Sequence, residues 1–376
     1  MTAQATSAQP TSAQQKSAAA TSAPMPSAPG KPAASDTRGP QIVSSSGTAS
    51  VHLTLAVCDY EHVREITQGL VRADGISLTP LIFPSIEEIT FRFTRSLEWD
   101  VSELSFGKYI SLTSQGNAPM IAIPVFPSRV HRHSAIYVRG DRGIRSAKDL
   151  EGRTVGIPEW AQTAGIYVRG FLAENHGVDL AKIQWMQAGV NEPGRAEKVE
   201  LKLPAGIRYR PRPDTSLSAM LASGEVDAII SARAPEAFAP GGAVVRLFPD
   251  YRAEEERFFK KTGIFPIMHL MTMRRAAYEQ HPWIAMNLYK MFDEAKRRCL
   301  ARLRDFTCAR IPLPWAAAIA DEIAAGYGPD PYPYGIEESR PTLEAFCRYA
   351  HDQGVTHRRM TIDDLFPREV RAMARV

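Results

Sequence analysis

Residues 120–139 read M-I-A-I-P-V-F-P-S-R-V-H-R-H-S-A-I-Y-V-R, and this stretch decides how the chain folds. The apolar run Met120–Phe126 is long enough for one buried strand, Pro127 ends it, and Ala135–Val138 forms a second strand-like run. Ligand sites in α/β sheets collect where strands end and the chain crosses over. We therefore expect an anion-binding cluster in a cleft here, although charge alone is equally consistent with a solvated basic loop. The cluster comprises Arg129, His131, Arg132 and His133.

Strand-like and helix-like runs alternate on both sides of this stretch. Such alternation predicts an α/β fold with mainly parallel sheets, and two such arrays joined by crossovers predict two lobes around a central cleft. We expect a first, discontinuous lobe of residues 51–130 and 240–376, and a second lobe of residues 131–239. Within this scheme Ala243–Leu247 returns toward the first lobe. The strand-like runs include Val51–Val57, Ile76–Phe83, Val101–Phe106, Ile183–Gln187, Val226–Ile230 and Gly263–Met273.

Composition excludes several classes of protein. A chain of 376 residues is enough for two domains, and its net charge of +4 does not favour nucleic-acid binding. No apolar run reaches the roughly 18–20 residues that a membrane helix needs. Residues 1–50 are rich in Ala, Ser, Thr, Gln and Pro and lack the apolar core of a signal peptide, so we expect a disordered tail and a cytoplasmic protein. The four cysteines are scattered, as is usual in a reducing compartment.

Several short words together carry a resemblance to a known family. They are F-P-S-R-x-x-R-H-S at Phe126–Ser134, G-I-P-E-W at Gly156–Trp160, E-P-G-R at Glu192–Arg195 and G-I-F-P-I-M-H at Gly263–His269. With these words the chain resembles the 4,5-dihydroxyphthalate decarboxylase family, which has a type II periplasmic-binding-protein-like fold. The resemblance covers about residues 51–366. One position departs from it, because the family pattern has an aromatic residue where this chain has His131.

The resemblance implies a cofactor-independent carboxy-lyase that converts 4,5-dihydroxyphthalate to 3,4-dihydroxybenzoate and carbon dioxide in phthalate degradation. Such a site needs cations for a small aromatic dicarboxylate, a proton donor over the ring carbon and an acceptor for the hydroxyl groups. Arginine suits the first role because its planar fork pairs with both carboxylate oxygens. The candidate cations are Arg129, Arg132, Arg195 and Arg233.

The catalytic candidates are His133 as the acid, His269 as the base and Glu159 as an acceptor for the hydroxyl groups. Trp160 is expected to stack on the substrate ring, and Thr163 lies at a helix start that favours anions. Structural alternatives remain for each of these residues. A lone histidine in an apolar run such as that around His269 is often a core residue, and Glu159 could simply cap the following helix.

Three other readings of the sequence stay open. The same fold would suit a non-catalytic solute-binding protein of an ABC-type transporter for an aromatic carboxylate. A second reading is a metal enzyme with His131, His133, Glu159 and His269 as ligands, although we assign no metal and find no cofactor motif. A third is a related decarboxylase that acts on another aromatic acid. The sequence is compatible with a homo-oligomer and does not fix the oligomeric state.

Overall fold

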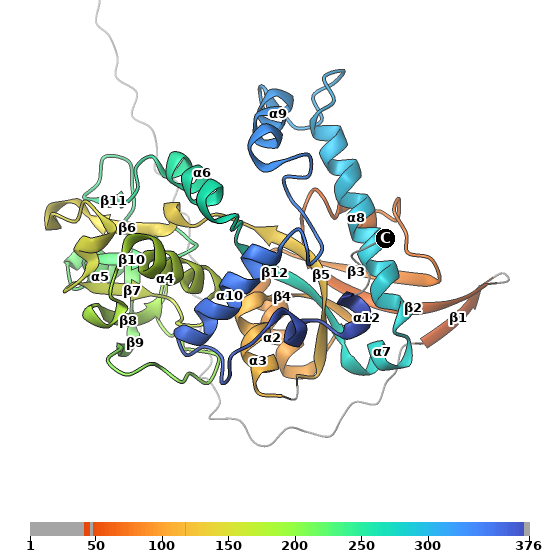
Figure 1. Ribbon diagram of the computed structural model, residues 1–376, viewed down its shortest axis with the longest axis horizontal. Helices are drawn as coiled ribbons and strands as arrows, with labels where there is room; N and C mark the ends of the chain where they lie inside the picture. The colour runs from red at the N-terminus through yellow and green to blue at the C-terminus, as the bar shows by residue number, and fades with distance from the viewer. Residues whose placement is uncertain (1–40, 46–47, 117, 372–376) are drawn as a thin grey trace, which may run out of the picture. The chain divides into compact units, whose positions relative to one another are not determined.

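The structure, a computed structural model, describes residues 41–45, 48–116 and 118–371. Residues 1–40 of the predicted tail lie outside this range. The described chain forms two six-stranded sheets with helices packed around them, as Figure 1 shows. The α/β fold class predicted from the sequence is therefore confirmed.

The first sheet combines strands that precede the second sheet in the sequence with one strand, β12, that follows it. Its strand order is β1-β2-β4-β12-β5, with β3 paired to the other strands through β2. β12 is antiparallel to both β4 and β5, whereas β2 is parallel to β3 and β4. β5 is buried along its whole length, as the apolar run in its sequence predicts. The strands are β1 (Gln41–Ser45), β2 (Thr48–Cys58), β3 (Ile76–Phe83), β4 (Val101–Ser105), β5 (Met120–Arg129) and β12 (Ile267–Arg274).

The second sheet is built entirely from the middle of the chain. Its strand order is β11-β6-β10-β7-β8-β9, in which β10, β7, β8 and β9 are parallel to one another and β6 is antiparallel to both β10 and β11. The strands are β6 (Ile136–Arg139), β7 (Thr154–Ile157), β8 (Gln184–Gly189), β9 (Arg208–Ser216), β10 (Ala228–Ile230) and β11 (Val244–Arg246).

Helices connect the strands and cover both sheets. α10 contacts α4 beside the second sheet and α3 beside the first, so it lies across the junction between them (Figure 1). Among the described residues, no helix has both the length and the apolar character needed to cross a bilayer. The main helices are α2 (Ile86–Ser96), α3 (Phe106–Ser114), α4 (Thr163–His176), α5 (Leu217–Ser223), α6 (Tyr251–Thr262), α7 (Arg275–Gln280), α8 (Trp283–Leu303), α9 (Ala316–Tyr327) and α10 (Arg340–Asp352). Shorter helices are α1 (Arg64–Thr67), α11 (Ile362–Leu365) and α12 (Arg368–Arg371).

Three features of the fold differ from the sequence-based expectations. Both sheets are mixed rather than mainly parallel, because β12 pairs antiparallel with β4 and β5 in the first sheet and β6 pairs antiparallel with β10 in the second. Val244–Arg246 pairs with β6 in the second sheet, so the segment at Ala243–Leu247 does not return to the first. The ordered fold also begins before Val51, since β1 pairs antiparallel with β2 from Gln41↔His52 to Ser45↔Thr48.

Candidate active site

His269 lies in β12, between β4 and β5 of the first sheet. In the pairing register it stands opposite Ser105 of β4 on one side and Ser128 of β5 on the other. β12 runs antiparallel to these strands, so the start of β12 lies at their carboxyl ends. The His269 side chain is 17% exposed, which leaves part of the ring accessible. The strand is otherwise apolar, I-M-H-L-M-T-M-R, because both faces of the sheet are covered.

Glu103 is the partner that orients this imidazole. Its side chain is fully buried, and Oε1 lies 2.7 Å from Nδ1 of His269. The Tyr60 hydroxyl donates to Oε1 at 2.6 Å, and the Cys58 backbone N–H donates to Oε2 at 2.8 Å. Burial alone would raise the pKa of Glu103, but these hydrogen bonds, the His269 bond foremost, hold it below its ordinary value.

The ionised Glu103 carboxylate fixes the tautomer of His269. An ionised carboxylate can only accept hydrogen bonds, so Nδ1 of His269 must donate to it. Nε2 is then the ring nitrogen that is available to exchange a proton with a bound molecule. Burial and the neighbouring Glu103 charge raise the pKa of Tyr60 and of Cys58, so both stay protonated. The arrangement is an acid–base pair with a fixed orientation.

Glu103 and Tyr60 stand in no motif that marks them as functional residues in the sequence. The available signal was the acidic residue inside the short strand V-S-E-L-S, because glutamate is almost never fully buried without a partner. That partner, His269, is 166 positions away in the sequence, so the spacing of residues could not reveal the pair.

The two sheets meet beside His269 through Thr163. Thr163 begins α4, and its Oγ1 accepts a hydrogen bond from the Gly107 backbone N–H at 2.9 Å. Oγ1 also lies 3.0 Å from the Ser105 hydroxyl, and Ser105 is the register partner of His269. The helix start that the sequence analysis singled out therefore faces the carboxyl end of β4 across the junction.

The four predicted cations have different surroundings. Arg129 is only 4% exposed, and its guanidinium donates to the carbonyl oxygens of Phe265 and Pro333 at 2.9 and 2.8 Å and to the Ser339 hydroxyl, so it stabilises the protein itself. Arg132 donates through Nε to Met268 Sδ at 3.2 Å. Within the described part of the chain, no carboxylate lies within ion-pair distance of Arg132, which leaves the end of its guanidinium for a ligand.

The other two cations lie on the side of the second sheet. Arg195 Nε contacts Glu159 Oε1 at 2.6 Å, and Lys198 Nζ lies 3.3 Å from the same oxygen. Arg233 is 71% exposed and reaches to 4.0 Å from Glu87 of α2, which flanks the first sheet. The predicted acceptor Glu159 is therefore already paired with two cations rather than poised for a hydroxyl group.

Two predicted residues lie in the core and not in a cleft. Trp160 is fully buried, with the Arg169 guanidinium 4.0 Å from its ring centre and its indole N–H bonded to the Gln353 carbonyl, so no face of the ring is left for a substrate. The His133 ring stacks on Phe171 with centroids 4.0 Å apart. Burial lowers the pKa of His133 to about 3, which does not suit the predicted role of proton donor at neutral pH.

The residues of the metal-enzyme reading have separate partners. His269 pairs with Glu103, Glu159 with Arg195, and His133 with Phe171, while Nε2 of His131 lies 2.9 Å from the Tyr327 hydroxyl. The structure therefore does not bring these four side chains together as one ligand set.

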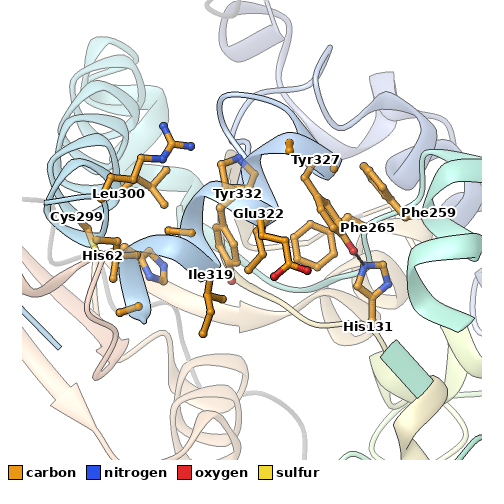
Figure 2. Close-up of a pocket in the computed structure, with 18 of the residues that line it drawn as sticks. His62, His131, Phe259, Phe265, Cys299, Leu300, Ile319, Glu322, Tyr327 and Tyr332 are labelled. Carbon is orange, nitrogen blue, oxygen red and sulfur yellow. Dashed lines mark hydrogen bonds between the residues drawn. The ribbon is translucent and has the colours of Figure 1, made fainter. Parts of the chain in front are cut away.

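A cavity of about 1020 Å³ is lined by residues of α6, α8 and α9, and His62 and His131 also line it (Figure 2). His62 lies between the cavity and the Glu103–His269 pair. Its ring centroid is 5.2 Å from that of Tyr60, which bonds to Glu103, and 5.2 Å from that of Tyr332 in the cavity wall. His131 lines the other end and stacks on Phe265 with a centroid distance of 4.8 Å. The cavity is mainly apolar, whereas the proton-exchanging groups lie at Glu103 and His269, so we place the candidate active site at this pair.

The geometry therefore defines a class of protein: an α/β protein with two mixed sheets and an oriented histidine–glutamate pair at the ends of its strands. The chain is 38% identical over 320 residues to 4,5-dihydroxyphthalate decarboxylase of Comamonas testosteroni, covering 85% of this chain and 97% of the relative. It is 46% identical over 193 residues to 4,5-dihydroxyphthalate decarboxylase of Pseudomonas putida, covering 51% of this chain and 74% of the relative. The chain therefore belongs to the 4,5-dihydroxyphthalate decarboxylase family.

Comparison with solved structures gives more distant similarities. The aliphatic sulphonate binding protein SsuA of Escherichia coli is 12% identical with a TM-score of 0.48, covering 85% of this chain and 99% of that chain. The desulfurization enzyme DszB is 16% identical with a TM-score of 0.42, covering 86% of this chain and 98% of that chain. No protein-family model matches the chain.

Proposed function

We propose that this protein removes one carboxylate from 4,5-dihydroxyphthalate as carbon dioxide and releases 3,4-dihydroxybenzoate. The observation that carries the proposal is the Glu103–His269 pair at the strand ends, in a chain that belongs to the family of these decarboxylases. Direct loss of carbon dioxide from a benzoate would leave an unstable aryl carbanion. Protonating the ring carbon first avoids this anion, and a protein donor at that carbon makes the step accessible.

In this mechanism His269 supplies the proton. The Glu103 carboxylate accepts the Nδ1–H of His269, so Nε2 is the ring atom that delivers a proton to the ring carbon that bears the carboxylate. The hydroxyl group para to that carbon donates electron density during the transfer. The carbon–carboxylate bond then breaks, carbon dioxide leaves and its electron pair restores the aromatic ring. Neutral His269 regains a proton from solvent, which balances the single proton that decarboxylation consumes.

Arg132 is proposed to hold the carboxylate that stays on the ring. Its guanidinium is partly buried and, among the described residues, has no carboxylate within ion-pair distance, although the Glu255 charge acts on it; Nε contacts Met268, the neighbour of His269. Arg233 is proposed to join from the second sheet when the substrate is bound, since within the described ranges its one carboxylate contact is with Glu87 at 4.0 Å. A forked cation on a planar carboxylate fixes the orientation as well as the affinity.

The two sheets are proposed to act as two lobes. The first lobe comprises the residues before 131 and after about 247, and the second lobe comprises the residues between them. The Thr163–Gly107 contact would then form when the lobes close. We further propose that the enzyme acts in the cytoplasm, which agrees with its four free cysteines. Fractionation of cells against a cytoplasmic marker enzyme checks this location.

The experiment incubates the purified chain with 4,5-dihydroxyphthalate and measures carbon dioxide and 3,4-dihydroxybenzoate, in H₂O and in D₂O. We expect turnover, and one deuterium on the ring carbon that lost its carboxylate. His269→Asn should lower kcat by roughly 10²–10⁴-fold, the usual scale for a lost general acid. His281→Asn is the matched control, because the ring contact of His281 is with Trp283, away from the pair. Binding without carbon dioxide release would instead support a solute-binding protein.

A further inference from the structure

A cluster of ligand-type side chains lies apart from the Glu103–His269 pair, on three separate elements. His133 begins the short 3-10 helix after the first crossover, His176 ends α4, and Glu254 lies in the first turn of α6. One side-chain ligand atom of each residue lies within 4.8 Å of the other two. Two imidazoles and one carboxylate are the donor types that borderline divalent metals such as Zn²⁺ prefer.

The buried imidazole of His133 is the second, independent observation. His133 is 1% exposed, and among the described residues neither ring nitrogen has a hydrogen-bond partner. The nearest carboxylate oxygen, Oε1 of Glu255, is 3.9 Å from Nδ1, which is too long for a hydrogen bond. That oxygen instead accepts the backbone N–H groups of His133 and Ser134 at 3.0 and 3.3 Å. Buried polar atoms without a partner are costly, and an ion is one of their common explanations.

The surroundings of His133 fix its ring plane without offering it a polar partner. Phe171 stacks on one face at 4.0 Å with an interplanar angle of 11°, and Phe258 and Phe248 meet the ring edge-on at 5.2 and 5.6 Å. An imidazole held in this way is preorganised for a metal, because little side-chain entropy remains to be lost on binding.

Two neighbouring features constrain the site. Arg257 pairs with Glu254 through Oε2 at 2.6 Å, so a metal must share the carboxylate or displace the guanidinium, which is 70% exposed and free to move. Zinc ligands lie roughly 3.4 Å apart, given bonds of about 2.0–2.1 Å. The side chains of His176 and Glu254, both partly exposed, must therefore close in on the fixed His133 ring.

We propose that His133, His176 and Glu254 bind one divalent metal ion of the zinc class, which ties the segment after the first crossover to α4 and α6. The role is structural, because His133 stacks on Phe171 within this cluster while the proton-exchanging pair is Glu103 and His269. The proposal does not depend on the proposed decarboxylation.

Titration calorimetry of the full-length, chelator-treated chain with Zn²⁺ alone tests the proposal, together with thermal unfolding. We expect one Zn²⁺ per chain and a higher Tm with metal, since ligands of the folded state stabilise it. Co²⁺ in the same site should give the visible absorption of a tetrahedral nitrogen–oxygen complex. His269→Asn should bind Zn²⁺ as the wild type does.

Variants separate this site from adventitious binding. His176→Gln and Glu254→Gln should each weaken Zn²⁺ binding at least 10-fold and abolish the rise in Tm. Both residues are partly exposed, so these variants should fold even if His133→Gln does not. Glu256→Gln on the same helix is the control, because Glu256 pairs with Arg252. Failure of the wild type to bind Zn²⁺, or unchanged binding in both ligand variants, would overturn the proposal.

Discussion

Arg129 and Arg132 lie three positions apart on the central stretch, but their guanidinium groups have different partners. Arg129 donates to two carbonyl oxygens and a hydroxyl group inside the protein. Arg132 donates through Nε to Met268 Sδ and is proposed to bind the substrate carboxylate with its terminal nitrogens. A buried charge that loses its hydrogen bonds is costly to the fold, whereas a cation at a binding site acts mainly on affinity.

We predict that replacing Arg129 mainly lowers stability, whereas replacing Arg132 mainly lowers substrate affinity. Arg129→Met should lower the free energy of unfolding by about 3 kcal/mol or more, because it leaves one buried and two partly buried acceptors unpaired. Arg132→Gln should change stability by less than about 1 kcal/mol and weaken substrate binding roughly 10- to 100-fold. Urea unfolding and the affinity for phthalate measure the two effects. Normal affinity in Arg132→Gln would remove this residue from the site.

The sequence predicted a site in this stretch but could not separate the surroundings of its two arginines. The basic cluster between two buried strands predicted a site near residues 129–133. What separates Arg129 from Arg132 are carbonyl oxygens at Phe265 and Pro333, more than a hundred positions along the chain. For the same reason Glu103 was missed, since only the fold brings it to His269.

Among the elements, α3 and α4 contact each other across the junction of the two sheets. The Gly107 backbone N–H bonds to Thr163, and a Cβ atom at Gly107 would lie 2.3 Å from the Ala161 carbonyl oxygen. Real Cβ atoms essentially never come so close to a backbone oxygen, so any larger residue at this position must push the two elements apart.

We predict that Gly107→Ala lowers kcat/KM at least 10-fold by keeping the lobes apart. Thr163→Val, which removes the acceptor without adding volume, should act in the same direction but more weakly. The control is Gly326→Ala in α9, where no atom lies within 4 Å of the new methyl group. That change should be neutral or stabilising by up to about 1 kcal/mol. Steady-state kinetics and small-angle scattering with and without substrate provide the measurement.

The predictability of the elements depends on their burial. β2, β5 and β12 were expected because their apolar runs are long and bounded. β9 was missed, since its sequence R-Y-R-P-R-P-D-T-S is largely exposed at the edge of the second sheet, where arginine and proline are tolerated. β11 has three residues, and so short a strand carries no information about the sheet that it joins.

For the whole molecule, buried neutral histidines make stability depend on pH. Burial lowers the pKa of His62 to about 4 and that of His131 to about 4, against about 6.5 in an unfolded chain. Between these values the unfolded state binds protons that the folded state does not. The free energy of unfolding therefore falls as pH drops from about 6.5 toward 4, and the contribution of these groups is fully present above 6.5.

We predict that His131→Phe flattens this pH dependence. Each such histidine contributes a slope of at most about 1.4 kcal/mol per pH unit within the window. Phenylalanine keeps the stack on Phe265 and removes the titrating group, although it loses the contact with the Tyr327 hydroxyl. Urea unfolding at pH 7, 6 and 5 measures the slope, with the partly exposed His357→Gln as the control. An unchanged slope in His131→Phe would show that His131 is already charged in the fold.

The fold class and the family were predictable at this scale because several short words of the sequence are spread over the whole chain. The sequence predicted a cleft between two lobes, but it did not predict the contact that Thr163 makes between the two sheets. The partners of Thr163 in this contact are Gly107 and Ser105. Neither a glycine nor a serine at these positions forms a distinctive sequence pattern.

The central place of β12 in the first sheet also sets the order in which the protein can form. β12 lies between β4 and β5, yet the chain completes every strand of the second sheet before it reaches Ile267. Until then β4 and β5 face each other as unpaired edges, and closing a gap of 166 positions carries the entropy cost of a long loop. Pairing over such separations is slow. The histidine that completes the acid–base pair is thus delivered by the last strand in the chain, so a nascent chain cannot assemble this pair before residues 267–274 have been made.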